Sequence, residues 1–127
     1  SRVLELTDGK KVPVVYDGVG KDTWETSLNC LELRGLLVSF GNASGAVSGV
    51  NLGILAQKGS LYVTRPTLGS YANSPETLQA MADEVFGMVS SGKVKVDDIR
   101  RFDLKDAAQA HTELAGRRTT GSIILVP

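Results

Sequence analysis

The feature that most constrains this chain is an apolar run that ends in a glycine-rich polar tip, and it occurs twice. The first run covers Val12 to Gly20 and the second covers Leu36 to Gly45. Each has the form of a buried strand whose carboxyl end opens into a tight loop of glycine and small polar residues. In open α/β sheets, ligands bind in the crevice outside the carboxyl ends of parallel strands. The pair therefore predicts a ligand site at one edge of a parallel sheet.

Charge and cysteine content narrow the classes of function. The chain has 127 residues, enough for one domain with a core, and its 14 basic and 14 acidic side chains balance. No excess of positive charge favours nucleic acid or an anionic membrane, so neither is expected as a partner. We find no run near the roughly 18 apolar residues of a membrane span and no signal-peptide core, so a cytoplasmic location is expected. With one cysteine and one histidine, no disulfide and no four-ligand Cys/His zinc site is expected within the chain.

Helix and strand signals alternate along the chain. Asp22 to Glu25 has the form of a capping box, and the helix that it starts is expected to end at Arg34 and Gly35. The segment Ser60 to Pro66 has the mixed character and terminal proline of an edge strand. Ser74 and Pro75 predict the start of a long amphipathic helix. A strand at 101–103, a helix at 105–115 and a strand at 122–126 complete the expected order. A strand, a helix and a strand in succession predict a right-handed βαβ unit.

Three segments in this order resemble a known family. They are the strand end at 14–20, the strand end at 38–45, and the pair of short stretches at 109–111 and 119–121. Together they are similar to the C-terminal part of the zinc-free, zeta-crystallin-like quinone oxidoreductases of the medium-chain dehydrogenase/reductase superfamily. The similarity covers essentially the whole chain. It implies an α/β fold, the second half of a doubly wound, mainly parallel Rossmann nucleotide-binding domain, followed by a C-terminal return segment.

The resemblance also implies different roles for two segments of the chain. Residues 1–92 correspond to the C-terminal half of the NADP-binding Rossmann domain, and residues 93–127 return toward a catalytic domain that this sequence does not contain. No G-x-G-x-x-G sequence is present. Because that turn normally carries the cofactor pyrophosphate, we expect residues 1–127 alone to bind NADPH weakly and to be inactive.

In this family the reaction is hydride transfer from NADPH to a quinone, and the cofactor carries the chemistry. The resemblance therefore implies no catalytic residue and no metal ligand in this chain. It implies that eleven residues contact NADPH: Asp17, Gly18, Val19, Ser39, Phe40, Gly41, Asn42, Thr64, Arg65, Pro66 and Arg117.

For several of these residues a structural interpretation stays open. Gly41 and Asn42 can simply make the turn that follows a strand. Asp17 can cap Lys21 or the next helix, and Arg65 can be a solvated charge. Arg117 can be a cation at the end of the last helix, and His111 is expected to be a packed helix residue rather than an acid or base.

Three functions remain open from the sequence. The first is NADPH-dependent quinone reduction, and the second is NADPH-dependent reduction of an enoyl or other α,β-unsaturated carbonyl substrate. The third is a non-enzymatic dimerisation or structural module. In the family, edge strands join two copies into one sheet, so a homodimer through residues 61–65 is expected.

Overall fold

The structure is a computed structural model that describes residues 2–96, 98–116 and 118–127. The chain divides into two compact units, Ser1–Asn73 and Ser74–Pro127. This division is based on spatial contacts between residues. The expected division into residues 1–92 and 93–127 is based on the roles of the two segments in a larger enzyme, and it stays a prediction.

The first unit is built on a parallel sheet. Its strands are β1 (Val12–Asp17), β2 (Leu31–Ser39) and β3 (Tyr62–Thr64), in the spatial order β1-β2-β3. Both pairs are parallel, so the predicted parallel arrangement and the edge position of β3 are confirmed. Asp17 lies opposite Ser39, and Val38 lies opposite Thr64. The three strands therefore end at the same edge of the sheet.

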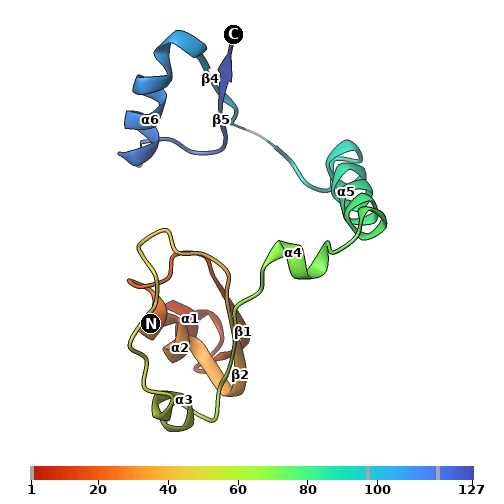
Figure 1. Ribbon diagram of the computed structural model, residues 1–127. Coiled ribbons are helices and arrows are strands. Elements are labelled where there is room, and N and C mark those ends of the chain that lie inside the picture. Colours follow the sequence, from red (N-terminus) through yellow and green to blue (C-terminus); the bar gives the residue numbers. More distant parts are fainter. Residues whose placement is uncertain (1, 97, 117) are drawn as a thin grey trace. The chain divides into compact units, whose positions relative to one another are not determined.

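The first unit also contains short helices (Figure 1). They are α1 (Arg2–Leu6), α2 (Trp24–Cys30), α3 (Gly53–Gln57) and α4 (Leu68–Tyr71). Helix α2 contacts β1 and β2. Leucines from this helix and from the strands form the core of the unit: Leu28, Leu31, Leu37 and Leu61. Trp24 and two residues of α3 pack partly buried against these leucines.

The expected boundaries of α2 are wrong at both ends. The N-cap is Thr23, and its side chain makes no cap hydrogen bond, so the predicted capping box does not form. The helix ends at Cys30 rather than at Arg34, because Leu31 is fully buried and already pairs with Val12 in the sheet. Arg34 adopts a left-handed conformation (φ 59°), and the pairing with β1 shifts register there. The arginine and glycine that predicted a helix end thus make an irregularity within β2.

The second unit contains α5 (Pro75–Ser90), β4 (Arg100–Asp103), a 3-10 turn η1 (Leu104–Asp106), α6 (Ala107–Ala115) and β5 (Ile123–Val126). The predicted start of α5 is confirmed: the Ser74 hydroxyl accepts from the Thr77 backbone N–H at 3.2 Å, and the Thr77 hydroxyl accepts from the Ser74 N–H at 3.1 Å. Strands β4 and β5 pair in parallel, and α6 contacts both.

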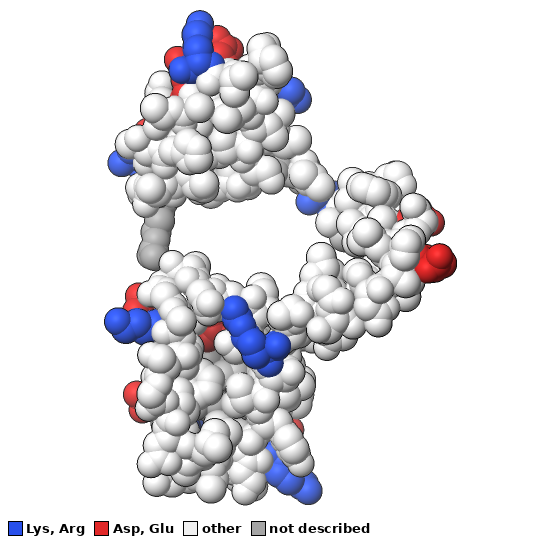
Figure 2. All heavy atoms as spheres, viewed as in Figure 1, with Lys and Arg blue, Asp and Glu red and all other residues white. Residues whose placement is uncertain are grey.

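Charged side chains are dispersed. On the face that Figure 2 shows, Lys and Arg stand in small separate groups over both units, interspersed with Asp and Glu. Among the described residues, no helix combines the length and apolar character that crossing a bilayer requires. The cytoplasmic location and the lack of nucleic-acid or membrane partners stay predictions.

Candidate functional site

Two loops follow the strand ends and form the candidate site. The Asp17 loop (residues 17–23) connects β1 to α2, and the Phe40 loop (residues 40–45) follows β2. Because β1 and β2 are parallel and Asp17 lies opposite Ser39, the loops leave the sheet side by side. This confirms that the chain has two adjacent glycine-rich strand ends.

The Asp17 carboxylate organises the first loop. Its side chain is 5% exposed. One oxygen accepts hydrogen bonds from the backbone N–H groups of Val19 at 2.9 Å and Gly20 at 3.0 Å. The hydroxyl of Thr23 lies 2.8 Å from both oxygens, and the hydroxyl of Ser27 donates to the second oxygen at 2.7 Å. Donors of its own loop and of α2 thus surround this carboxylate.

These hydrogen bonds decide the charge state of Asp17. Burial by itself raises the pKa of this carboxyl, because it disfavours the charged form. Hydrogen bonds from the Gly20 backbone and from Ser27 and Thr23 favour the carboxylate and outweigh burial, so the pKa lies below its ordinary value. Asp17 does not cap Lys21, because the Lys21 N–H donates to the Gly45 carbonyl. Its partners are instead the N–H groups of its loop and two hydroxyls at the start of α2, and its contact with NADPH stays a prediction.

The Asp17 loop in turn shapes the Phe40 loop. The carbonyl of Asp17 accepts from the N–H groups of Phe40 at 2.9 Å and Gly41 at 3.4 Å. The carbonyl of Val19 accepts from both the N–H and the hydroxyl of Ser44, each at 2.8 Å. The carbonyls of the Asp17 loop therefore fix the backbone of the Phe40 loop.

Gly41 is required where the two loops meet. A Cβ atom at this position would overlap the backbone of Gly18, including its carbonyl oxygen. A Cβ on Gly18 would meet the Phe40 ring at 3.0 Å. Close backbone approach accounts for Gly41, and the neighbouring Phe40 ring accounts for Gly18; neither glycine has a positive φ angle.

Arg65 joins the third strand end to the second. Its guanidinium donates to the carbonyls of Ser39 at 2.7 Å and Gly41 at 3.2 Å. In the amide orientation that satisfies both neighbours, Asn42 donates to the Gly41 carbonyl at 2.9 Å and accepts from Arg65 at 3.3 Å. The interpretation of Arg65 as a merely solvated charge is therefore wrong, although its side chain is exposed.

These contacts leave few backbone groups for a ligand. The N–H groups of Phe40 and Gly41 and the carbonyls of Ser39 and Gly41 are all engaged. Within the described part of the chain, no hydrogen bond engages the Phe40 carbonyl or the Asn42 N–H. The Phe40 side chain is 55% exposed. A ligand at this edge therefore meets the backbone at 40–42, the Phe40 ring and the outer side of the Arg65 guanidinium.

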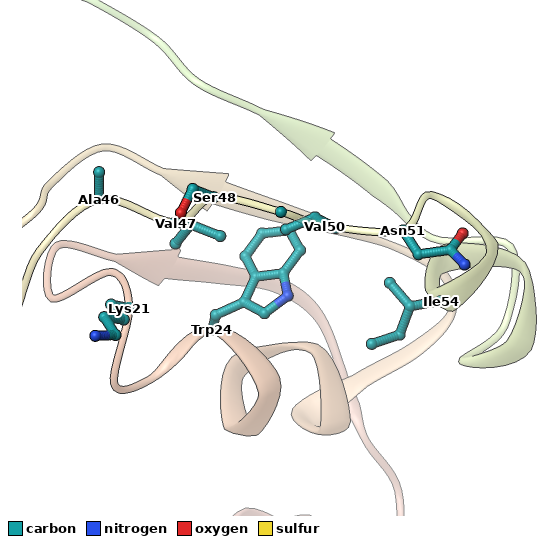
Figure 3. Close-up of a pocket in the computed structure, with 9 residues that line it drawn as sticks. Lys21, Trp24, Ala46, Val47, Ser48, Val50, Asn51 and Ile54 are labelled. Carbon is teal, nitrogen blue, oxygen red and sulfur yellow. The ribbon is translucent and has the colours of Figure 1, made fainter.

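Two cavities lie beneath the segment that follows the Phe40 loop. One, of about 410 Å³, has Ser39, Asn42 and Arg65 in its wall together with apolar side chains that include Trp24. The other, of about 320 Å³, also contains Trp24 (Figure 3). Figure 3 shows the indole reaching from α2 toward Val47 and Val50. The sequence did not predict that Trp24 lines these cavities. Its helical spacing with Leu28 and Leu31 indicates only core packing.

Most of the predicted site residues share one edge of the sheet. The structure brings together the following ones: Asp17, Gly18, Val19, Ser39, Phe40, Gly41, Asn42, Thr64, Arg65 and Pro66. Arg117 lies outside the described residues. His111, expected to be packed, is exposed on α6. The described residues contain no group of three or more His, Cys, Asp or Glu side chains arranged to hold a metal ion.

Thr23 and Ser27 are further site residues that the sequence pattern did not predict. Both hydroxyls are directed to Asp17 rather than to a helix cap or to solvent. The only signal was their spacing of four residues, which puts them on one face of α2. Nothing in the sequence showed that this face meets a carboxylate.

We predict that Asp17→Asn destabilises the protein in a pH-dependent way. A carboxyl whose folded pKa is lowered contributes stability above its unfolded pKa and loses it as pH falls through the folded pKa. At pH 7 the cost in free energy of unfolding should be about 2 kcal/mol, the scale of hydrogen bonds to a charged group. The difference from the unsubstituted protein should narrow below about pH 4. Urea unfolding from pH 3 to pH 7 measures both.

Asp22→Asn is the matched control, because Asp22 is exposed in the same loop. It should change the free energy of unfolding little at any of these pH values. An Asp17→Asn cost that is the same at pH 3 and pH 7 would contradict the role given to the charge.

A second prediction concerns Gly41. Because a Cβ has no room against Gly18, Gly41→Ala should lower the free energy of unfolding by about 2–4 kcal/mol, the range of severe backbone and packing changes. Gly69→Ala is the control, since a Cβ there meets no atom within 4 Å. Thermal unfolding compares the stability of the two variants. Equal melting temperatures would contradict the prediction, because they would show that the two loops can move apart at little cost in free energy.

Comparison with known proteins agrees with this geometry. The family model described as zinc-binding dehydrogenase matches residues 1–125. A quinone oxidoreductase of Pseudomonas aeruginosa is 74% identical over 126 residues, which are 99% of this chain and 39% of that protein. A 2-haloacrylate reductase of a Burkholderia species is 40% identical over 126 residues, 98% of this chain and 38% of that protein.

Among solved structures, that of Escherichia coli quinone oxidoreductase complexed with NADPH matches with a TM-score of 0.92 at 58% identity. The match covers 99% of this chain and 39% of that one. The chain thus spans about two fifths of the length of these relatives, and the expected resemblance is confirmed. The chain belongs to the zinc-binding dehydrogenase family, within the medium-chain dehydrogenase/reductase superfamily and alongside its quinone oxidoreductases.

Proposed function

We propose that this chain is part of an NADPH-dependent quinone oxidoreductase and supplies the nicotinamide side of its cofactor site. The observation that carries the proposal is the shared edge of three parallel strands, where Arg65 and the Asp17 loop hold residues 39–42 in one conformation. Its support from relatives is the 74% identity with a quinone oxidoreductase and the likeness to one that is complexed with NADPH.

The residues at this edge fit a flat, polar ring. The close contact of Gly41 with Gly18 keeps side-chain atoms out of the turn. The Phe40 carbonyl and the Asn42 N–H offer one acceptor and one donor, which is the pattern that a carboxamide needs. Asp17 is buried and its carboxylate is bonded within the protein, so this side chain does not face an anionic cofactor, and Arg65 provides positive charge.

When bound, NADPH supplies the hydride that reduces the quinone. The proposed task of this chain is to bind and orient the nicotinamide and to limit water at that edge. The proposed contact residues are those predicted from the sequence: Asp17, Gly18, Val19, Ser39, Phe40, Gly41, Asn42, Thr64, Arg65, Pro66 and Arg117. For Asp17 the geometry supports contact through the backbone only, since its carboxylate is surrounded by its own donors.

One observation favours a second candidate. The 40% identity with a 2-haloacrylate reductase supports the reduction of an activated carbon–carbon double bond. The quinone assignment rests on a higher identity, 74%. A purely structural module stays the third alternative.

The test is NADPH oxidation by the protein that carries this chain, with 1,4-benzoquinone, 9,10-phenanthrenequinone, 2-chloroacrylate and 2-cyclohexenone as acceptors. The absorbance of NADPH at about 340 nm gives the rate. We expect kcat/KM for at least one quinone to exceed that for both alkenes by tenfold or more, about 1.4 kcal/mol in transition-state stabilisation. Faster reduction of an alkene would favour the second candidate, and no oxidation with any acceptor would favour the structural module.

We further propose a homodimer in which residues 61–65 of two copies pair at the edge of the sheet. Strand β3 is an edge strand of the sheet, and Tyr62 is 62% exposed. An edge strand presents unpaired backbone groups that a second copy satisfies. Pairing would also cover the tyrosine.

We predict that Tyr62→Asp converts the dimer to a monomer, because a charged side chain on an edge strand disfavours pairing with a second strand. Sedimentation velocity measures the mass. Tyr71→Asp is the control, since Tyr71 is 63% exposed on α4, outside the strand. A monomeric unsubstituted protein, or a dimer that survives Tyr62→Asp, would contradict this interface.

A further inference from the structure

Two hydroxyls at the start of α2, of the N-cap residue Thr23 and of Ser27, bind a carboxylate of the preceding loop rather than the helix backbone. Thr23 is the N-cap residue, yet its side chain makes no cap hydrogen bond. Its hydroxyl lies 2.8 Å from both oxygens of Asp17, and Ser27 donates to the same carboxylate at 2.7 Å. A buried carboxylate needs such donors, since an unpaired buried charge is costly. These hydroxyls therefore hold the carboxylate in place.

From the carboxylate the contacts lead to the candidate cofactor edge in two steps. Asp17 fixes the N–H groups of Val19 and Gly20, which sets the course of the Asp17 loop. That loop then presents the carbonyls of Asp17 and Val19 to the amides of the Phe40 loop. No hydroxyl of α2 contacts residues 40–42 directly in the hydrogen bonds of the described chain.

We propose that Thr23 and Ser27 are positioning residues for the NADPH site: by anchoring Asp17 they hold residues 40–42 in the binding conformation before the cofactor arrives. This inference rests on the function proposed above. The two hydroxyls do not contact the cofactor in this proposal. They raise the fraction of molecules whose Phe40 loop is in the binding conformation before NADPH binds.

That role has a kinetic signature. When a binding-competent conformation is only partly populated, the apparent Kd rises in proportion, while the bound state is unchanged. Loss of an anchoring hydroxyl should therefore raise the Kd and KM for NADPH and leave kcat nearly unaltered. A hydroxyl that served the general stability of the fold would lower the melting temperature without this split.

The variants are Thr23→Val and Ser27→Ala in the full-length protein. Thr23→Val keeps the branched shape and removes the hydroxyl, and because Thr23 makes no cap bond it leaves the helix start intact. Thr23→Ser restores the hydroxyl and serves as the rescue. Thr26→Val is the matched control, since Thr26 is exposed on the same helix.

Calorimetric titration with NADPH and steady-state kinetics with a quinone give Kd, KM and kcat. We expect Thr23→Val and Ser27→Ala each to raise Kd and KM for NADPH by about fivefold to tenfold, the scale of one ordinary hydrogen bond. Changes in kcat should stay within about twofold. Thr23→Ser and Thr26→Val should match the unsubstituted protein.

Two results would overturn the inference: an unchanged Kd in both variants, or a fall in kcat without a change in Kd. If Thr23→Val fails to fold, Ser27→Ala, which removes a single oxygen atom, decides by the same criteria. The proposed function is judged separately on the unsubstituted protein. Failure of that protein to bind NADPH would remove the function and the inference together, whereas normal binding with unaffected variants would remove the inference alone.

Discussion

The arrangement of the first unit's ligand edge depends on one buried charge. Asp17 ends β1 as a buried residue, where an ion without partners would be strongly destabilising. Backbone N–H groups of its loop and two hydroxyls of α2 satisfy it. Because those donors come from both sides of the β1–α2 connection, the charge fixes the loop and the start of the helix at once.

The conformation of the Phe40 loop depends on the Asp17 loop. Its amides reach the carbonyls of the Asp17 loop, and Arg65 from the end of β3 occupies the carbonyls on its other side. A binding edge held by hydrogen bonds from both neighbouring strand ends loses little conformational entropy when a ligand binds, which favours affinity. The same arrangement explains why glycine stands at Gly41, where the two backbones nearly touch.

Local signals were reliable where local chemistry decides the structure. The Ser74–Pro75 start of α5 was predicted correctly, because a serine N-cap followed by proline satisfies the first helical turn within a few residues. The end of α2 was predicted wrongly, because Arg34 and Gly35 have the residue types of a helix C-terminus. Burial of Leu31 against the core ended the helix earlier, and tertiary packing overrode the local pattern.

The sequence by itself determined the parallel strands, their glycine-rich carboxyl ends and the edge position of β3, because apolar runs, glycines and a terminal proline act over short distances. It also carried the family resemblance. Only the tertiary structure decided what the polar side chains do. The hydroxyls of Thr23 and Ser27 meet Asp17, and Arg65 meets the carbonyls of Ser39 and Gly41, through contacts between segments up to 26 residues apart. Such partners are chosen by the packing of strands and helices in space, which no local pattern of residues encodes.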